Sequence, residues 1–513
     1  MTKHDQPATA SPAGARTVRE AELSSRAAAN TIAQLAPPVL RVVLGVVLVA
    51  LLSRRLGLDG LGQYALIFSY VALFNVVFND WGLTTIVLRE ISQHPEERRA
   101  LLRAASSLQV AVSAISYACM VAGVFLLGYP EPVRYGAMIY GLTIFAGPIN
   151  LLALPFQADL RLTELLAPSL AQAVLAFALS VAVLAAGSSV VWLAAASLAA
   201  VGVQYAWIAL LCRRLTSSPA AMPGDARRSM WRRLARDAWP VGAASTLKVG
   251  WQQVPVLILG AYSLGATGLF HAANRVPQQL VVVPLALNTT MFPLLARSWA
   301  ADRPLFARQL DRLVGGSLFA VVPAVVFGVA TAGPFVRLLL GPEFSGAVTP
   351  YALLLVTAAL LFPIIFFAEA LNAASCQRLN LALLAALTPL LTVAVFLAAR
   401  HGGATEVAAA LLGGYSAYLA ALFVAALVRF GRAASVSAIG TSAVAALAGG
   451  VAAFVSRDAG ELISGTIGAG AAAAAFAVAR PDLAALTRRL VGAVPALSPH
   501  AVAQEAPHGQ HTS

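Results

Sequence analysis

Charged and amide side chains recur at helical spacing inside otherwise apolar stretches of this 513-residue chain. Lys248 is followed one turn later by Gln252. On the next predicted helix, His271, Arg275 and either Gln278 or Gln279 follow one another at helical spacing, which places them along one face. Cations and amides on one face can bind phosphate oxygens and hydroxyl groups. These residues therefore predict a site for an anionic, hydroxylated ligand.

The composition indicates that this site lies in a membrane protein. Hydrophobic residues make up 59% of the chain, charged residues 11%, and the mean hydropathy is +0.78. Soluble domains carry about 25% charged residues, so this chain has too few to cover a soluble surface. Three scattered cysteines are too few for a disulfide framework or a zinc site: Cys119, Cys212 and Cys376.

Apolar blocks of about 20 residues, long enough to cross a bilayer as helices, repeat from residue 30 almost to the C-terminus. Helices are expected because each backbone amide in lipid must be bonded within its own segment. We predict an all-α polytopic membrane protein with about fourteen transmembrane helices, at 30–52, 63–83, 108–128, 135–156, 165–186, 190–212, 239–261, 268–291, 313–333, 350–371, 381–399, 406–428, 438–456 and 461–479.

The basic residues predict the orientation of these spans. Most of the 35 lysines and arginines fall in segments that are cytoplasmic if the N-terminus is cytoplasmic, which is the positive-inside pattern. Only Arg41, Lys248 and Arg275 fall inside predicted spans. The first 29 residues lack the apolar core of a cleavable signal peptide. We expect both termini to be cytoplasmic.

The order of the spans predicts six parts. They are a cytosolic tail at 1–29, a six-helix bundle at 30–212, a basic cytoplasmic linker at 213–238, a second six-helix bundle at 239–428, two further transmembrane helices at 429–480 and a cytosolic tail at 481–513.

The linker carries a dense run of arginines with apolar residues interleaved at near-helical spacing, which is typical of an interfacial amphipathic helix. One interpretation is attraction to anionic inner-leaflet lipids; the other, which the topology rule favours, is a positive-inside loop without a partner. Nucleic-acid binding is not expected. The residues are Arg227, Arg228, Arg232, Arg233 and Arg236, with Met230, Trp231, Leu234 and Trp239.

A short motif recurs 208 residues along the chain. Leu56-Gly57-x-x-Gly60-Leu61 follows the first predicted helix, and Leu264-Gly265-x-x-Gly268-Leu269 follows the seventh. Matching motifs at the same topological place predict two duplicated halves with the substrate site between them.

The same offset relates polar residues of the two halves. It places Arg41 one residue from the position of Lys248, and Asp80 on Asn288. If the halves face one another, these groups line a positive central cavity that suits a pyrophosphate and sugar hydroxyls. The predicted cavity site comprises Arg41, Asn75, Asn79, Asp80, Lys248, Gln252, His271, Arg275, Gln278 and Asn288.

Structural roles are the alternative for several of these residues. Arg41 could extend to the inner interface, and Asp80 could pair with Arg41. Gln172 and Gln204, single amides on apolar helices, are expected to bridge neighbouring helices.

Three stretches carry a resemblance to a known family: SRRLGLDGLGQYALIFSYVALFNVVFNDWGL at 53–83, YSLGATGLFHAANRVPQQLVVVPLALNTTMFPLLARSWA at 262–300 and LLLGPEFSGAVTPYALLL at 338–355. They resemble the Wzx-type O-antigen and oligosaccharide flippases of the MOP superfamily, which includes the MATE drug exporters and the lipid II flippase. The resemblance covers roughly residues 25–430 and implies two six-helix bundles in the bacterial inner (cytoplasmic) membrane. It further implies flipping of an undecaprenyl-pyrophosphate-linked oligosaccharide for lipopolysaccharide or other surface polysaccharide, with the polymerase and chain-length machinery as partners.

Two other functions stay open. A MATE-like cation-coupled multidrug antiporter needs buried carboxylates, and Asp80 is the one mid-span candidate. A non-transporting membrane scaffold needs no polar interior. The sequence has no ATP-binding loop, no H-E-x-x-H and no Cys-x-x-Cys, so neither an enzyme activity nor a cofactor is expected. An H⁺ gradient, an Na⁺ gradient and the membrane potential remain open as energy sources.

Overall fold

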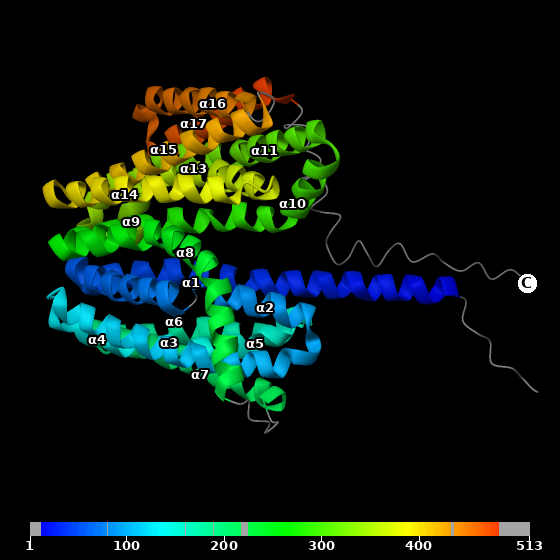
Figure 1. The fold of residues 1–513 in the computed structure, drawn as a ribbon. Coiled ribbons are helices and arrows are strands. Elements are labelled where there is room, and N and C mark those ends of the chain that lie inside the picture. The colour runs from blue at the N-terminus through cyan, green and yellow to red at the C-terminus, as the bar shows by residue number, and fades with distance from the viewer. Residues whose placement is uncertain are drawn as a thin grey trace, which may run out of the picture. The chain divides into compact units, whose positions relative to one another are not determined.

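The computed structural model describes residues 12–79, 81–159, 161–187, 189–216, 224–431 and 436–481. All regular structure in these ranges is helical (Figure 1), which confirms the predicted all-α class. The chain divides into two compact units, Met1–Leu264 and Gly265–Ser513. The division lies after the helix that we expected to open the second bundle, because that helix packs with the first unit.

The first unit is built from long helices joined by short π- and 3₁₀-helical turns. They are α1 (Pro12–Phe74), α2 (Leu83–Gln93), α3 (Arg98–Leu126), α4 (Glu131–Gly141), α5 (Gly147–Ala158), α6 (Leu166–Ala185), α7 (Val190–Thr216) and α8 (Gly224–Tyr262).

The second unit begins within α9, and its first span is bent by 47° between Asn288 and Met291. Its helices are α9 (Leu264–Leu280), α10 (Val282–Ala301), α11 (Arg303–Ala330), α12 (Ala332–Leu340), α13 (Val348–Ala373), α14 (Gln377–His401), α15 (Ala404–Phe430), α16 (Val436–Val455) and α17 (Glu461–Ala479).

Ten helical segments of the described chain are long and apolar enough to cross a membrane, or eleven if the bent α9–α10 pair is one span. All fourteen predicted ranges overlap helix. Three of the predicted spans are not among these segments. They are the two arms of α1, at 30–52 and 63–83, and the apolar part of α8 at 239–261. The number fourteen therefore stays a prediction.

Glycines in the first motif copy shape α1. Its direction changes at Gly57, whose φ of 64° lies in the left-handed region that residues with a Cβ avoid. Gly62, just after the motif, packs against the backbone carbonyl of Leu264, where a side chain would collide with the oxygen. The chain after the first motif copy therefore meets the first residue of the second copy.

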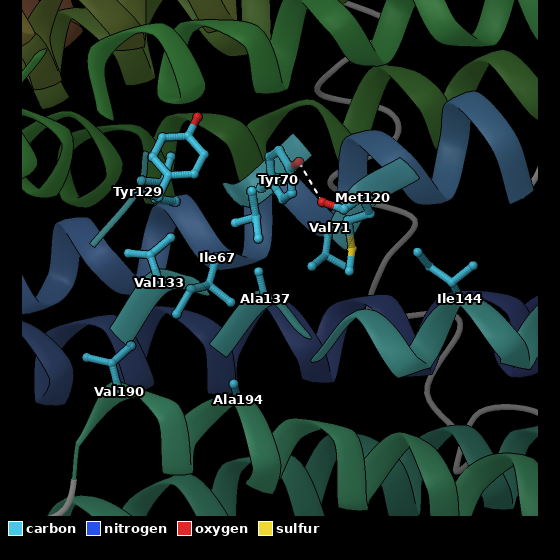
Figure 2. Packing of buried hydrophobic residues seen from close by; sticks show 12 residues of the cluster. Ile67, Tyr70, Val71, Met120, Tyr129, Val133, Ala137, Ile144, Val190 and Ala194 are labelled. Atoms are coloured by element: carbon cyan, nitrogen blue, oxygen red, sulfur yellow. Dashed lines mark hydrogen bonds between the residues drawn. The ribbon is translucent and has the colours of Figure 1, made fainter. Parts of the chain in front are cut away.

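The core of the first unit forms around the second arm of α1. Ile67, Tyr70 and Val71 are buried there against side chains of α3, α4 and α7 (Figure 2). The Tyr70 hydroxyl donates a hydrogen bond of 2.9 Å to the carbonyl oxygen of Met120. This bond satisfies the polar end of a buried ring and fixes α1 against α3.

The last two helices pack through small residues against each other and against α11. A Cβ on Gly468 would lie 2.8 Å from the Gly449 carbonyl oxygen, so the backbones of α16 and α17 are in direct contact. At the end of α17, Arg480 donates to Asp311 of α11 at 2.6 Å, and both side chains are largely buried. The terminal pair is thus an integral part of the second unit.

Replacement of Gly242 by alanine is expected to destabilise the protein, because α8 passes so close to Trp81 that an added Cβ collides with the Trp81 carbonyl. Overpacking of this kind costs about 1–3 kcal/mol, so the Tm in detergent should fall by roughly 1–3 °C. Gly250→Ala on the same helix is the matched control, because its Cβ would find only Val254 at 3.9 Å. Equal Tm values for the two variants would contradict the close approach of α8.

Candidate functional site

A cavity of about 350 Å³ lies within the first unit, and half of its lining residues carry uncharged polar side chains. Six elements contribute them, and the described lining contains no charged residue. The polar lining residues are Asn75, Thr84, Gln109, Asn150, Gln157, Ser169 and Gln204.

The end of α1 supplies one wall of this cavity. The helix continues past Phe74 as a π-helical segment, Asn75–Asn79, a geometry that often marks functional sites. The chain then breaks, and α2 begins at Leu83 after Gly82, which has a φ of 91°. This break brings Thr84, in the first turn of α2, to the same cavity as Asn75.

The other walls come from α3, α6 and α7. Gln109 of α3 is 1% exposed. Gln204 of α7 donates a hydrogen bond of 3.4 Å to the hydroxyl of Ser169 on α6. This bond confirms the predicted bridging role of Gln204, and the same amide also lines the cavity.

The accessible edge of the cavity is formed by α5. Asn150 and Gln157 lie two turns apart on this helix, and both side chains are exposed. Asn150 also bonds with the side chain of Tyr205, which lies within electrostatic range of Arg41. Arg41 is exposed on α1, so a predicted site cation lies near the edge of the amide cavity.

The other predicted residues of the first unit lie on α8 or outside the described side chains. Lys248 and Gln252 are exposed and one turn apart, but neither lines the amide cavity. Asp80 lies outside the described residues, and of Asn79 only the backbone is described.

The predicted residues of the second unit lie along the bent α9–α10 span. His271 and Arg275 are half-buried and one turn apart, and Gln278 is exposed. The Nε of Arg275 and the Oδ1 of Asn288 are buried without a hydrogen-bond partner among the described atoms. Such atoms are rare because they cost free energy unless water or a ligand bonds them. The described residues therefore leave the hydrogen-bonding capacity of both atoms unused.

A second cavity, of about 650 Å³, lies within the second unit and has apolar walls. Valine, leucine and alanine side chains of α11, α13 and α16 form most of its surface. Arg457, in the turn between α16 and α17, is the one charged residue of its described lining.

The amide cavity can bind a neutral, hydroxylated ligand, because each amide offers both donors and acceptors. Sequence reasoning selected Asn75 but missed Thr84, Gln109, Asn150 and Gln157. The available signal was a lone polar residue in each of several apolar ranges, and only the fold shows that they converge.

Among the described residues, no group of three or more His, Cys, Asp or Glu side chains could hold a metal ion.

Comparisons with known proteins agree with this architecture. A family model described as "Polysaccharide biosynthesis protein" matches residues 51–349. The fold is similar to that of the lipid II flippase MurJ in an inward-closed conformation, with a TM-score of 0.66 and 13% identity over 88% of this chain and 99% of that chain. No curated protein matches the sequence.

Two further structures share the fold. One is an inward-facing MATE family multidrug resistance transporter of the MOP superfamily, with a TM-score of 0.62 and 14% identity over 79% of this chain and 98% of that chain. The other is a MOP superfamily transporter from Pyrococcus furiosus, with a TM-score of 0.56 and 15% identity over 79% and 96%. The comparisons confirm the predicted family resemblance and the MOP-type fold.

A cysteine placed at Asn150 should react with a membrane-impermeant maleimide, because its side chain is exposed at the edge of a polar cavity. Val174→Cys is the matched control, since that position is also exposed but lies on the apolar surface of α6. A thiol in lipid does not ionise, so the cavity position should react at least about ten times faster. Equal rates would contradict an accessible polar cavity at this position. Both variants require serine in place of Cys119, Cys212 and Cys376.

Proposed function

Because the chain belongs to the polysaccharide biosynthesis protein family, we propose that it flips a lipid-linked oligosaccharide from the inner to the outer leaflet of the cytoplasmic membrane. Family and fold are those of membrane transporters. The observation that supports an oligosaccharide cargo is the amide-lined cavity of the first unit. We propose undecaprenyl pyrophosphate as the carrier and surface polysaccharide, such as O-antigen, as the product.

The amide cavity suits the sugar part of such a substrate. Sugar hydroxyls both donate and accept hydrogen bonds, and so do the side chains of Asn75, Asn150 and Gln157. Because the described lining carries no charge, each of its groups can exchange water for a sugar hydroxyl without burying an unpaired ion.

Three cations suit the pyrophosphate. Arg41, Lys248 and Arg275 form no ion pair with a described acidic side chain, and the Nε of Arg275 has no partner. Guanidinium and ammonium groups bind phosphate oxygens through charge-assisted hydrogen bonds, which are about twice as strong as neutral ones. The predicted role of these cations in binding an anionic cargo remains part of the proposal.

The apolar cavity of the second unit suits the lipid part. An isoprenoid chain that moves from the bilayer into this cavity exchanges lipid tails for protein side chains that are equally apolar. Contact with the apolar walls therefore costs no desolvation of polar groups, apart from Arg457 at one end. The three chemical parts of the substrate thus each have a counterpart among the described residues.

Both alternative functions find less support. A cation-exporting antiporter needs carboxylates in its binding site, and the described lining of the amide cavity has none. A scaffold without a transport cycle needs no polar cavity. An H⁺ gradient, an Na⁺ gradient or the membrane potential as the driving force, and the polymerase and chain-length machinery as partners, remain part of the proposal.

The double variant Asn150→Leu/Gln157→Leu should reduce export of surface polysaccharide about tenfold or more, because each lost neutral hydrogen bond to the cargo costs about 0.5–1.5 kcal/mol. Export is measured in a deletion strain at matched expression, together with lipid-linked sugar accumulating on the inner leaflet. Gln93→Leu, an exposed amide at the end of α2, is the control and should leave export unchanged. Normal export in the double variant would contradict a sugar-binding role for this cavity.

Lys248→Ala and Arg275→Ala should each reduce export on the order of tenfold to a hundredfold, because hydrogen bonds to a charged group contribute about 1.5–3 kcal/mol. Arg400→Ala is the control, since Arg400 is exposed at the end of α14. If both site variants exported polysaccharide normally at normal expression, the cationic site would be refuted. Dye efflux that depended on these residues would instead favour the drug antiporter.

A further inference from the structure

The first part of α8 is an amphipathic segment that packs on the rest of the first unit. In Figure 1 its light-green ribbon runs across the neighbouring helices rather than along them. Leu234 and Ala238 are buried against side chains of α2, α3 and α5. The ring nitrogen of Trp231 donates to the Ala104 carbonyl at 3.0 Å and to the Ser107 hydroxyl at 3.2 Å.

This packing corrects one expectation for the basic linker. The apolar face of its helix is covered by protein, whereas an interfacial helix of the expected type places that face in the acyl chains. Met230 and Trp231 contribute to the covered face together with Leu234. Any contact with lipid must therefore use the opposite, basic face.

Two of the five arginines already have partners within the unit. Arg233 forms an ion pair of 2.9 Å with Glu90 of α2, whose side chain is 16% exposed. The guanidinium of Arg227 lies 5.6 Å from the centre of the Trp231 ring. The ion pair connects α8 to α2, whereas the ring contact lies within α8 and leaves the charge of Arg227 unneutralised.

The other three arginines form an outward stripe. Arg228, Arg232 and Arg236 are exposed at i, i+4 and i+8, and none forms an ion pair among the described residues. Trp239 follows at i+11 and is 61% exposed. Because a helix turns 100° per residue, these four side chains lie within an arc of about 80°. The nearby acid Asp237 is exposed but lies outside this arc.

We propose that the stripe of Arg228, Arg232, Arg236 and Trp239 binds the headgroups of anionic phospholipids in the inner leaflet. Guanidinium groups bind phosphate in a bidentate manner, and basic clusters beside a membrane span attract anionic lipid. Trp239 lies where α8 enters its apolar part, the position at which tryptophan marks the headgroup region. A soluble anion would not need this tryptophan. The surface is separate from the residues proposed to bind the transported substrate.

Binding of phosphatidylglycerol and of phosphatidylcholine to the purified full-length protein, measured by native mass spectrometry, tests the assignment. The wild type should prefer phosphatidylglycerol. The triple variant R228Q/R232Q/R236Q should bind it on the order of a hundredfold more weakly, because each basic residue near an anionic surface contributes about a factor of five. Phosphatidylcholine binding should stay unchanged. A triple variant that retained the preference would overturn the assignment.

Two further variants test whether the triple glutamine variant acts through lost charge or through altered folding. Arg233→Gln removes the ion pair with Glu90 but leaves the stripe intact, so its lipid preference should stay at the wild-type level. The triple lysine variant R228K/R232K/R236K keeps the charge and should retain the preference within about threefold. Loss of the preference in Arg233→Gln would overturn the assignment to the outward stripe. Displacement of phosphatidylglycerol by equimolar inorganic phosphate or a short RNA would instead indicate a soluble anion. None of these measurements depends on transport.

Discussion

Satisfaction of backbone hydrogen bonds in lipid is the constraint from which the rest of this structure follows. Each apolar segment must bond its own amides, so all regular structure of the described chain is helical and binding chemistry is left to side chains. Departures from the regular helix are tolerated only where protein or a cavity receives the freed groups. The π-helical segment Asn75–Asn79 and the break before Gly82 are such a place, and they border the amide cavity.

Close backbone packing then decides which helices share a unit. Gly62 of α1 lies against the carbonyl of Leu264, the first residue of α9, and Gly242 of α8 lies against the carbonyl of Trp81, two residues before α2, so these backbones meet without intervening side chains. As a result Lys248 belongs to the same compact unit as Arg41, although the 208-residue offset relates them as counterparts in two halves. The repeat in the sequence therefore relates these two cations as equivalent positions, whereas the fold places both in the same unit.

Periodicity and hydropathy were sufficient to predict the helical class and the position of most spans, because both depend on local composition. The same signals could not locate the boundary after Leu264, which depends on backbone contacts made by single glycines. They also could not assemble the amide cavity. Gln109, Asn150 and Gln157 each look like an isolated polar residue, and only the packing of α3 and α5 with α2, α6 and α7 brings them together.

The arginines of the chain fall into two groups, according to whether they pair with a carboxylate. Arg98, Arg233 and Arg480 pair with carboxylates on other helices and hold those helices together. An arginine with a partner is a poor ligand for a second anion, because it would have to give up a charge-assisted hydrogen bond first. Arg275 and the outward arginines of α8 form no such bond with a carboxylate among the residues that the structure describes. The absence of a described acidic partner, rather than the number of positive charges, is therefore the property on which their proposed binding of anionic substrates and lipids rests.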